Sequence, residues 1–194
     1  MNRKEIRIAG FGGQGIVLSG SILGKAASIY DTGFASLTQS YGPESRGGSC
    51  RAEVVMSDAP IDYPYVVSPQ VQIILSQEAY TEYGQNALPG TLVIVDSDLV
   101  HIDPAQTPKP LSVPASRMAQ ELGRVVVANI IMLGFFTAVT GAVSVESALN
   151  AVLDSVPKAT EEMNATAFQK GCDYGLAVLK GQEKKATGKT GARR

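Results

Sequence analysis

A glycine-rich segment near the start of the chain, Gly10-Phe11-Gly12-Gly13-Gln14-Gly15, separates two stretches of different periodicity. Residues 5–9 (EIRIA) are typical of a short strand, whereas residues 16–30 place apolar side chains at helical spacing. A strand, a tight glycine loop and a helix in this order are typical of the first unit of an α/β fold. With residues 34–37 as the returning strand, the segment predicts a right-handed parallel βαβ unit.

The alternation of strands and helices continues beyond this unit. Residues 50–56, 71–75 and 91–95 predict further strands, with a helix over 77–85 and an edge strand near Leu111. After Pro114 the chain is predicted to be mainly helical, over residues 115–122, 125–143, 144–156 and 159–180. The fold class is therefore α/β: a Rossmann-like doubly wound, mostly parallel sheet with a helix-rich C-terminal third.

Length and composition favour one domain. The 194 residues are 44% hydrophobic and 18% charged, which supplies a core and excludes a disordered chain. We predict a single domain over residues 1–180. Residues 181–194 carry five Lys and Arg residues against one Glu and no apolar repeat, so we expect a basic, disordered tail there.

Charge and cysteine content restrict the partners and the chemistry. A net charge of −1 does not suit a surface for nucleic acid. With only Cys50, Cys172 and His101, the chain lacks the ligands that an iron–sulfur cluster or structural zinc requires, so we expect no metal site. No secretion signal is visible, and the uncharged stretch 125–143 predicts a buried helix rather than a membrane span. A cytoplasmic location is expected.

The glycine loop predicts contact with an anion, usually a phosphate, because glycines allow close backbone approach and the following helix begins with free N–H groups. The alternative is that these glycines only permit tight packing between helix and strand. Dinucleotide binding is disfavoured, because Asp31 precedes the second strand instead of ending it. A Walker A lysine is absent from the loop, which removes support for ATP hydrolysis.

A second segment, Gln39-Ser40-Tyr41-Gly42-Pro43-Glu44-Ser45-Arg46-Gly47-Gly48, is predicted to form a surface loop after the second strand. In a doubly wound sheet this loop lies at the same edge as the glycine loop, so the two should face one another. Arg46 offers a fork of donors that suits phosphate or carboxylate. The alternative is a local ion pair between Glu44 and Arg46 that stiffens the loop.

Four other polar residues carry no catalytic assignment. His101 has no evident companion acid or nucleophile, and Asp96 and Asp98 suit a loop or a helix cap as well as a site. Asn129, in an apolar stretch, would satisfy buried backbone or cross a subunit interface.

The chain resembles a known family at three places: the gamma subunit or domain of 2-oxoacid:ferredoxin oxidoreductases. The resemblance rests on residues 10–16 (GFGGQGI), residues 39–48 (QSYGPESRGG) and residues 128–134 (ANIIMLG), and its extent is about residues 5 to 180. The sequence of residues 41–46 is most similar to that of the 2-oxoglutarate branch. Pyruvate, branched-chain 2-oxoacid and indolepyruvate enzymes are related.

The resemblance implies a multi-subunit enzyme that converts 2-oxoglutarate, CoA and oxidised ferredoxin to succinyl-CoA, CO2 and reduced ferredoxin. Thiamine diphosphate with Mg and the iron–sulfur cluster would belong to the alpha and beta partner subunits, and ferredoxin would accept the electrons. This subunit would support CoA binding and assembly, with no catalytic residue of its own. The residues expected near the coenzyme are Gly10, Gly12, Gly13, Gln14, Gly15, Tyr41, Gly42, Pro43, Glu44, Arg46, Gly47 and Gly48.

Two other functions remain open from the sequence. The chain would be a purely structural subunit of a related pyruvate, branched-chain or indolepyruvate enzyme, with both loops serving as interfaces. Alternatively, it would be a stand-alone nucleotide-binding oxidoreductase, which the displaced Asp31 disfavours.

Overall fold

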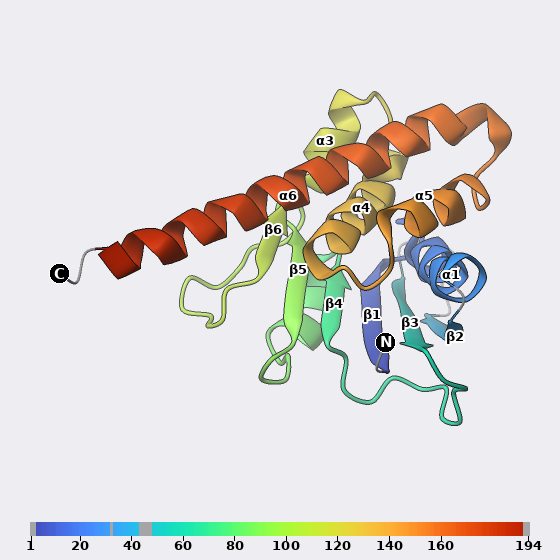
Figure 1. Ribbon diagram of the computed structural model, residues 1–194, viewed down its shortest axis with the longest axis horizontal. Coiled ribbons are helices and arrows are strands. Elements are labelled where there is room, and N and C mark those ends of the chain that lie inside the picture. Colours follow the sequence, from blue (N-terminus) through green and yellow to red (C-terminus); the bar gives the residue numbers. More distant parts are fainter. Residues whose placement is uncertain (1–2, 32, 43–47, 192–194) are drawn as a thin grey trace.

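A single six-stranded sheet forms the centre of the computed structural model, with the strand order β2–β3–β1–β4–β5–β6 (Figure 1). The structure describes residues 3–31, 33–42 and 48–191, with side chains as far as residue 181. The strands are β1 (Lys4–Phe11), β2 (Phe34–Tyr41), β3 (Ser49–Ser57), β4 (Val71–Ile74), β5 (Leu92–Asp96) and β6 (Leu111–Val113).

Five of the six strands in the described chain run in one direction. β1, β4, β5 and β6 pair in parallel, whereas β3 pairs antiparallel with both β1 and β2. β2 therefore points the same way as β1 without touching it. The predicted α/β fold with a mostly parallel sheet is confirmed.

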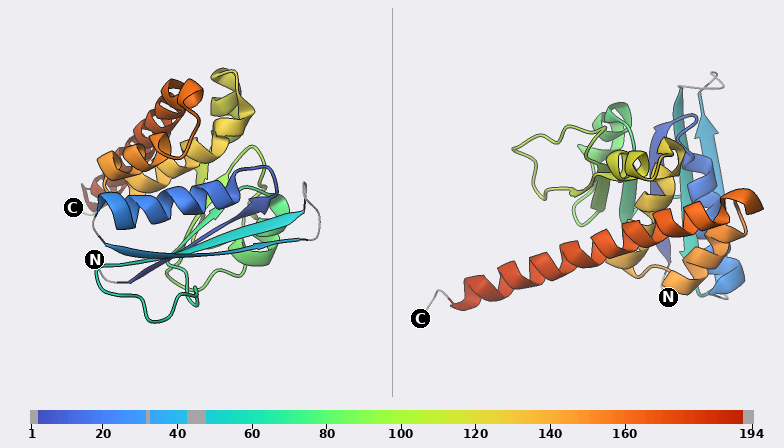
Figure 2. Two further views of the ribbon diagram at one scale, coloured as in Figure 1. Left: turned by 90° about the vertical axis from the view of Figure 1, so that its right-hand side faces the viewer. Right: turned by 90° about the horizontal axis from the view of Figure 1, so that it is seen from above.

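Helices cover both faces of the sheet, as the doubly wound prediction requires (Figure 2). α1, α4, α5 and α6 lie on one face, and the short α2 with the π-helical turn η2 lies on the other. Their bounds are α1 (Ile16–Lys25), η1 (Ala26–Tyr30), α2 (Gln77–Ala79), η2 (Tyr80–Gly84), α3 (Ala115–Glu121), η3 (Val125–Val127), α4 (Ala128–Thr140), α5 (Val145–Leu153), η4 (Lys158–Thr160) and α6 (Glu161–Gly191).

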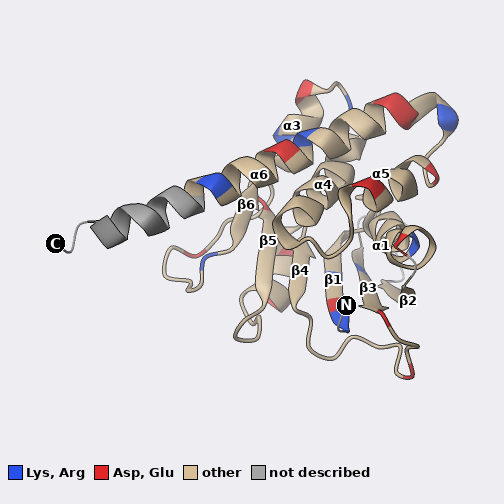
Figure 3. Ribbon diagram, in the orientation of Figure 1, with Lys and Arg blue, Asp and Glu red and all other residues tan. Residues whose placement is uncertain are grey.

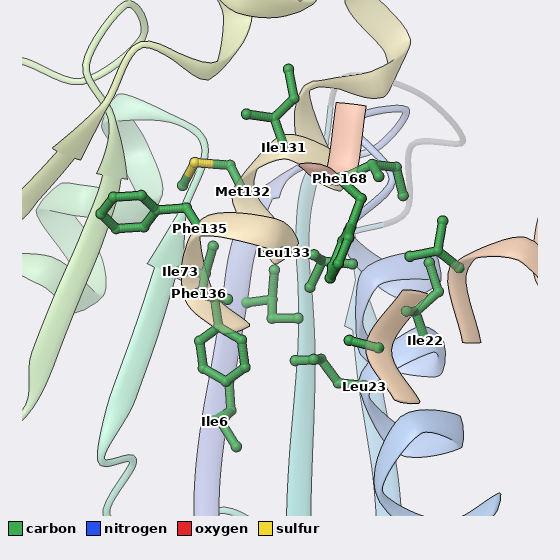
Figure 4. Packing of buried hydrophobic residues seen from close by; sticks show 14 of the residues in the cluster. Ile6, Ile22, Leu23, Ile73, Ile131, Met132, Leu133, Phe135, Phe136 and Phe168 are labelled. Carbon is green, nitrogen blue, oxygen red and sulfur yellow. The ribbon is translucent and has the colours of Figure 1, made fainter. Parts of the chain in front are cut away.

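The helix α4 occupies the middle of the larger core. It carries no charged residue (Figure 3), and every residue from Ala128 to Thr137 is buried. Figure 4 shows its side chains among others from the sheet, α1 and α6, including Ile6, Ile73, Ile22, Leu23 and Phe168. The prediction of a buried helix in this stretch is confirmed. No helix in the described part of the chain is long and apolar enough to cross a bilayer.

Two glycines bring α4 and α6 into backbone contact. A Cβ atom on Gly134 would lie 2.1 Å from the carbonyl oxygen of Phe168, and one on Gly171 would lie 2.0 Å from that of Ile131. Both distances are shorter than any real Cβ contact. Only glycine at these two positions allows the helices to pack this closely.

Two local predictions were wrong. Residues 34–37 do not form a parallel neighbour of β1, because the antiparallel β3 is inserted between β1 and β2. The second strand also continues to Tyr41, so residues 39–41 belong to β2 and not to the loop. The polar side chains of β2 are compatible with a strand because most of them are exposed at the edge of the sheet.

The helix α6 runs past the body of the molecule toward the C-terminus (Figure 1). Its backbone is helical to Gly191, within the segment expected from the sequence to be a disordered tail. The boundary at residue 180 and the disorder of the tail in solution stay predictions.

We predict that Gly134→Ala and Gly171→Ala each destabilise the fold. The added methyl group collides with a backbone carbonyl of the facing helix, so the two helices must separate. Overpacking of this kind costs about 1–3 kcal/mol in the free energy of unfolding. Denaturant titration of the purified chain, followed by circular dichroism, measures this cost.

Gly181→Ala is the matched control, because Gly181 is also in α6 and has open space around it. There, the higher helix propensity of alanine leaves the free energy of unfolding unchanged or raises it by up to about 1 kcal/mol. Equal effects at Gly171 and Gly181 would contradict the close helix contact.

Candidate functional site

The glycine loop joins the end of β1 to the start of α1 in a conformation that requires glycine at two positions. Gly13 has φ of 97° and Gly15 has φ of 73°, both in the left-handed region. A Cβ atom on Gly15 would also lie 2.4 Å from the side-chain nitrogen of Asn129. The loop conformation therefore depends on both the backbone and the neighbouring α4.

Gln14 holds the loop in place. Its Oε1 accepts a hydrogen bond from the Phe11 N–H at 2.6 Å, and its Nε2 donates to the Leu75 carbonyl, just beyond β4, at 2.8 Å. A Cβ atom on Gly10 would lie 2.4 Å from the same Oε1. Gln14 and Gly10 thus shape the loop from behind, and the ligand contact expected of them stays a prediction.

The two predicted loops lie against one another. The Gly12 N–H donates to the Gly48 carbonyl at 2.9 Å and so joins the glycine loop to the second loop. The bond from the Gly42 N–H to the Ser49 carbonyl, also 2.9 Å, closes the second loop itself, between the ends of β2 and β3. The prediction that the loops face one another is confirmed for these ends. Pro43, Glu44, Ser45, Arg46 and Gly47 lie outside the described residues.

A cleft of about 550 Å³ opens between the two loops and the first turn of α1. A cavity of this size suits a small molecule or part of a coenzyme. α1 has no side-chain cap and no acidic residue in its first turn, so its free N–H groups and the positive end of its dipole favour an anion in the cleft. The cleft is lined by Gly12, Gly13, Gly15, Ile16, Val17, Leu18, Tyr41, Gly42, Gly48 and Cys50.

A second cavity of about 230 Å³ adjoins the cleft and shares Gly13, Gly15 and Leu18 with it. The first turns of α1, α4 and α6 all contribute to its wall, and Arg124 adds a cation. α6 begins with two glutamates, which offset its positive end, whereas α4 and α1 begin without acidic residues. The second cavity is lined mostly by apolar residues, and Arg124 is the charged residue among them.

Asn129 connects α4 to the glycine loop. Its Nδ2 donates to the Gly15 carbonyl and to Ser19 Oγ, both at 3.3 Å, and only 4% of the residue is exposed. Of the two roles left open from the sequence, satisfying buried backbone is confirmed. An amide in an otherwise apolar stretch is the sequence feature that indicated a buried polar role for Asn129. Its hydrogen-bond partners could not be predicted from the sequence.

Cys50 lines the cleft but is 6% exposed, and burial raises the pKa of its thiol. The thiol is therefore neutral near pH 7. A neutral thiol is a poor nucleophile, which agrees with a site that binds a ligand without reacting with it.

Asp96 and Asp98 serve the fold. Asp96 is fully buried and accepts hydrogen bonds from the N–H and Oγ of Ser116, at 3.0 and 2.7 Å, which fixes the start of α3. Burial raises the pKa of Asp96 in spite of these bonds. Asp98 pairs with Arg117 at 2.8 Å, and the backbone N–H of His101, not its imidazole, donates to Gln77 Oε1. Across the described residues, no group of three or more His, Cys, Asp or Glu could hold a metal ion.

Comparison with known proteins shows which family this chain is similar to. The family model for pyruvate ferredoxin/flavodoxin oxidoreductase matches residues 5–174. The 2-oxoglutarate synthase subunit KorC of Methanocaldococcus jannaschii is 52% identical over 172 residues, which covers 87% of this chain and 92% of that protein.

Two solved structures share the fold. The gamma subunit of keto/oxoacid ferredoxin oxidoreductase from Geobacter sulfurreducens has a TM-score of 0.82 and 43% identity, over 91% of this chain and 98% of that one. The 2-oxoglutarate:ferredoxin oxidoreductase from Magnetococcus marinus, solved with 2-oxoglutarate, coenzyme A and succinyl-CoA bound, has a TM-score of 0.80 at 23% identity, over 91% of this chain and 32% of that one.

We predict that Gln14→Leu loosens the glycine loop. The substitution leaves the Phe11 N–H and the Leu75 carbonyl without their partner, at a cost of about 1–3 kcal/mol for each buried group. Hydrogen exchange of the amides of residues 11–15 should become faster, and the free energy of unfolding should fall.

Gln85→Leu provides the comparison, because Gln85 is exposed and its side chain makes no hydrogen bond among the described residues. Its effect on unfolding should stay within about 0.5 kcal/mol. Loop exchange rates equal to wild type in Gln14→Leu would show that Gln14 does not hold the loop.

We predict that Cys50 is alkylated slowly at neutral pH. Its pKa is raised above the ordinary value of 9.0, so the thiolate fraction and the rate with iodoacetamide should still be rising above pH 9. A Cys172→Ala background removes the other thiol, and urea-unfolded protein gives the ordinary profile. A rate that levels off below pH 9 in the folded chain would contradict the raised pKa.

Proposed function

This chain belongs to the pyruvate ferredoxin/flavodoxin oxidoreductase family, and on this premise we propose that it is the gamma subunit of a 2-oxoglutarate:ferredoxin oxidoreductase. The complex would convert 2-oxoglutarate, CoA and oxidised ferredoxin to succinyl-CoA, CO2 and reduced ferredoxin. The observation that carries the substrate assignment is the 52% identity to a 2-oxoglutarate synthase subunit, over 92% of that protein. A cytoplasmic location is part of this proposal.

The groups that perform the redox chemistry belong to other subunits in this proposal. Thiamine diphosphate with Mg stabilises the acyl carbanion, and an iron–sulfur cluster accepts electrons one at a time. The two cysteines of this chain are both buried and on different elements, Cys50 in β3 and Cys172 in α6. They cannot ligate such a cluster, so alpha and beta subunits would hold it.

We assign to this chain the task of holding the phosphate part of CoA. The glycine-loop cleft fits that group in two respects: its volume of about 550 Å³ and its free N–H groups at the uncapped start of α1. Arg46 lies in the sequence between Gly42 and Gly48, which both line this cleft, and it would supply a bidentate contact to a phosphate. The adjoining cavity, with Arg124 in its wall, extends the same favourable potential.

Exposed apolar side chains in the cleft and in the cavities beside it favour contact with partner subunits. Val125 and Val126 are 57% and 69% exposed, Tyr41 is 60% exposed, and Leu18 and Leu99 are each more than one-third exposed. Apolar groups gathered at one edge of a sheet are typical of a protein interface. CoA would then lie between this chain and a partner subunit.

The same apolar rim supports a second candidate function, a purely structural subunit. In that case the loops contact protein and not coenzyme. The two functions differ in one measurable property, because only the first makes the affinity for CoA depend on this chain.

The complex itself tests the main proposal. When this chain is tagged in its own cells and isolated, iron, thiamine diphosphate and CoA-dependent viologen reduction should copurify, with the highest activity on 2-oxoglutarate among a panel of 2-oxo acids. A colourless single chain without this activity would overturn the proposal. Highest activity with another 2-oxo acid would overturn the substrate assignment alone.

We predict that Arg46→Ala in the assembled enzyme raises the KM for CoA. A lost hydrogen bond to a charged group is worth about 1.5–3 kcal/mol, or roughly a 10- to 150-fold change. Lys109→Ala serves as the control, because Lys109 is exposed and lies away from the glycine loop, beside β6. An unchanged KM with unchanged subunit composition would refute the role of Arg46, and loss of subunits with an unchanged KM would favour the structural function.

A further inference from the structure

Two buried amides line the second cavity, and each has an oxygen without a partner. Asn129 and Asn164 are 4% and 6% exposed and lie in the first turns of α4 and α6. The Nδ2 of Asn164 donates to the Thr160 carbonyl at 2.8 Å, and the Nδ2 of Asn129 donates to the Gly15 carbonyl. Because a carbonyl oxygen only accepts, these bonds fix which end of each amide is the nitrogen. Neither Oδ1 accepts a hydrogen bond from any described residue, so both remain available to a donor in the cavity.

The rest of the wall restricts the size and character of that donor. Val126, Val127, Ile130 and Met163 make the wall largely apolar. The volume of about 230 Å³ is less than half the 550 Å³ of the cleft. Pockets for whole small-molecule ligands usually have about 300–1,000 Å³. The second cavity therefore suits one compact, mostly apolar part of a ligand that donates hydrogen bonds.

Arg124 supplies the one charged group of this cavity. Its guanidinium forms no ion pair and no side-chain hydrogen bond with the residues that the structure describes. A guanidinium stacks on flat aromatic rings, and nucleobases are often bound in this way. A flat aromatic ring that carries an amino group therefore matches the arginine, the apolar wall and the two amide oxygens together.

We propose that the second cavity binds the adenine ring of CoA, with the exocyclic amino group donating to Asn164 and Asn129. This inference rests on the proposed function, which puts the phosphates in the cleft. Gly13, Gly15 and Leu18 border both spaces, so a base and its phosphates can occupy them at the same time. The pantetheine arm is a less suitable occupant, because its thiol must leave this chain to reach the thiamine diphosphate of a partner subunit.

Competition by two nucleotides in the assembled enzyme tests the assignment. ADP and IDP share the ribose and the diphosphate, but IDP has a carbonyl oxygen where ADP has the amino group. ADP should compete with CoA, and IDP should inhibit roughly tenfold more weakly, because its oxygen would face two acceptors.

Variants of Asn164 locate this preference in the second cavity. Asn164→Leu should remove most of the preference for ADP over IDP, because it removes an acceptor oxygen. Asn164→Ala makes the same test without added bulk, should the leucine variant fail to assemble, and Asn164→Asp should keep the preference because it keeps an acceptor. Asn150→Leu is the matched control, since Asn150 is exposed on α5 and does not line this cavity.

Equal inhibition by ADP and IDP in the wild type would overturn the adenine site. A preference for ADP that survives in both Asn164→Leu and Asn164→Ala would do the same, because the base would then bind elsewhere. Neither result touches the proposed function, which still stands if Arg46→Ala raises the KM for CoA. The proposed function fails by a different observation, a purified assembly without CoA-dependent activity.

Discussion

The burial of α4 from Ala128 to Thr137 is the constraint on which the rest of this structure depends. An uncharged apolar helix is stable only where it is covered, and here the sheet, α1, α3, α5 and α6 supply the cover. α6 can approach closely enough only because Gly134 and Gly171 bring backbone against backbone. The start of α4 is fixed by the same packing. It carries Asn129 to the glycine loop, so that the core and the candidate site are connected by one buried amide.

Hydrogen bonds to three neighbouring segments therefore hold the glycine loop. Gln14 ties it to the end of β4, Asn129 ties it to α4, and the Gly12 N–H ties it to the second loop. These bonds use the polar groups behind the loop, and the uncapped first turn of α1 remains directed at the cleft. The arrangement resembles an anion site that is formed before its ligand arrives, which lowers the entropic cost of binding.

Much of the fold was predictable from the sequence because its signals are local. The strand, glycine loop and helix at residues 5–30, the apolar runs of β4 and β5, and the uncharged α4 each follow from periodicity and composition. The pairing partners were not predictable in this way, because strand order depends on contacts between residues far apart in the chain. For the site, the facing of the two loops was predictable from topology. The roles of Gln14 and Asn129 were not, since each depends on a partner from a distant element.

The insertion of β3 between β1 and β2 changes the strand order but keeps the second loop beside the glycine loop. A parallel β2 beside β1 would have placed its following loop at the carboxyl edge of the sheet. The observed hairpin of β2 and β3 places it at the same edge, because Tyr41 and Ser49 flank the turn beside the end of β1. The predicted and the observed arrangements of β2 differ at the outer edge of the sheet. An antiparallel hairpin moves β2 to the boundary of the sheet, where its uncharged sequence has no partner within the described chain. The same rearrangement that completes the candidate site therefore also creates the open edge.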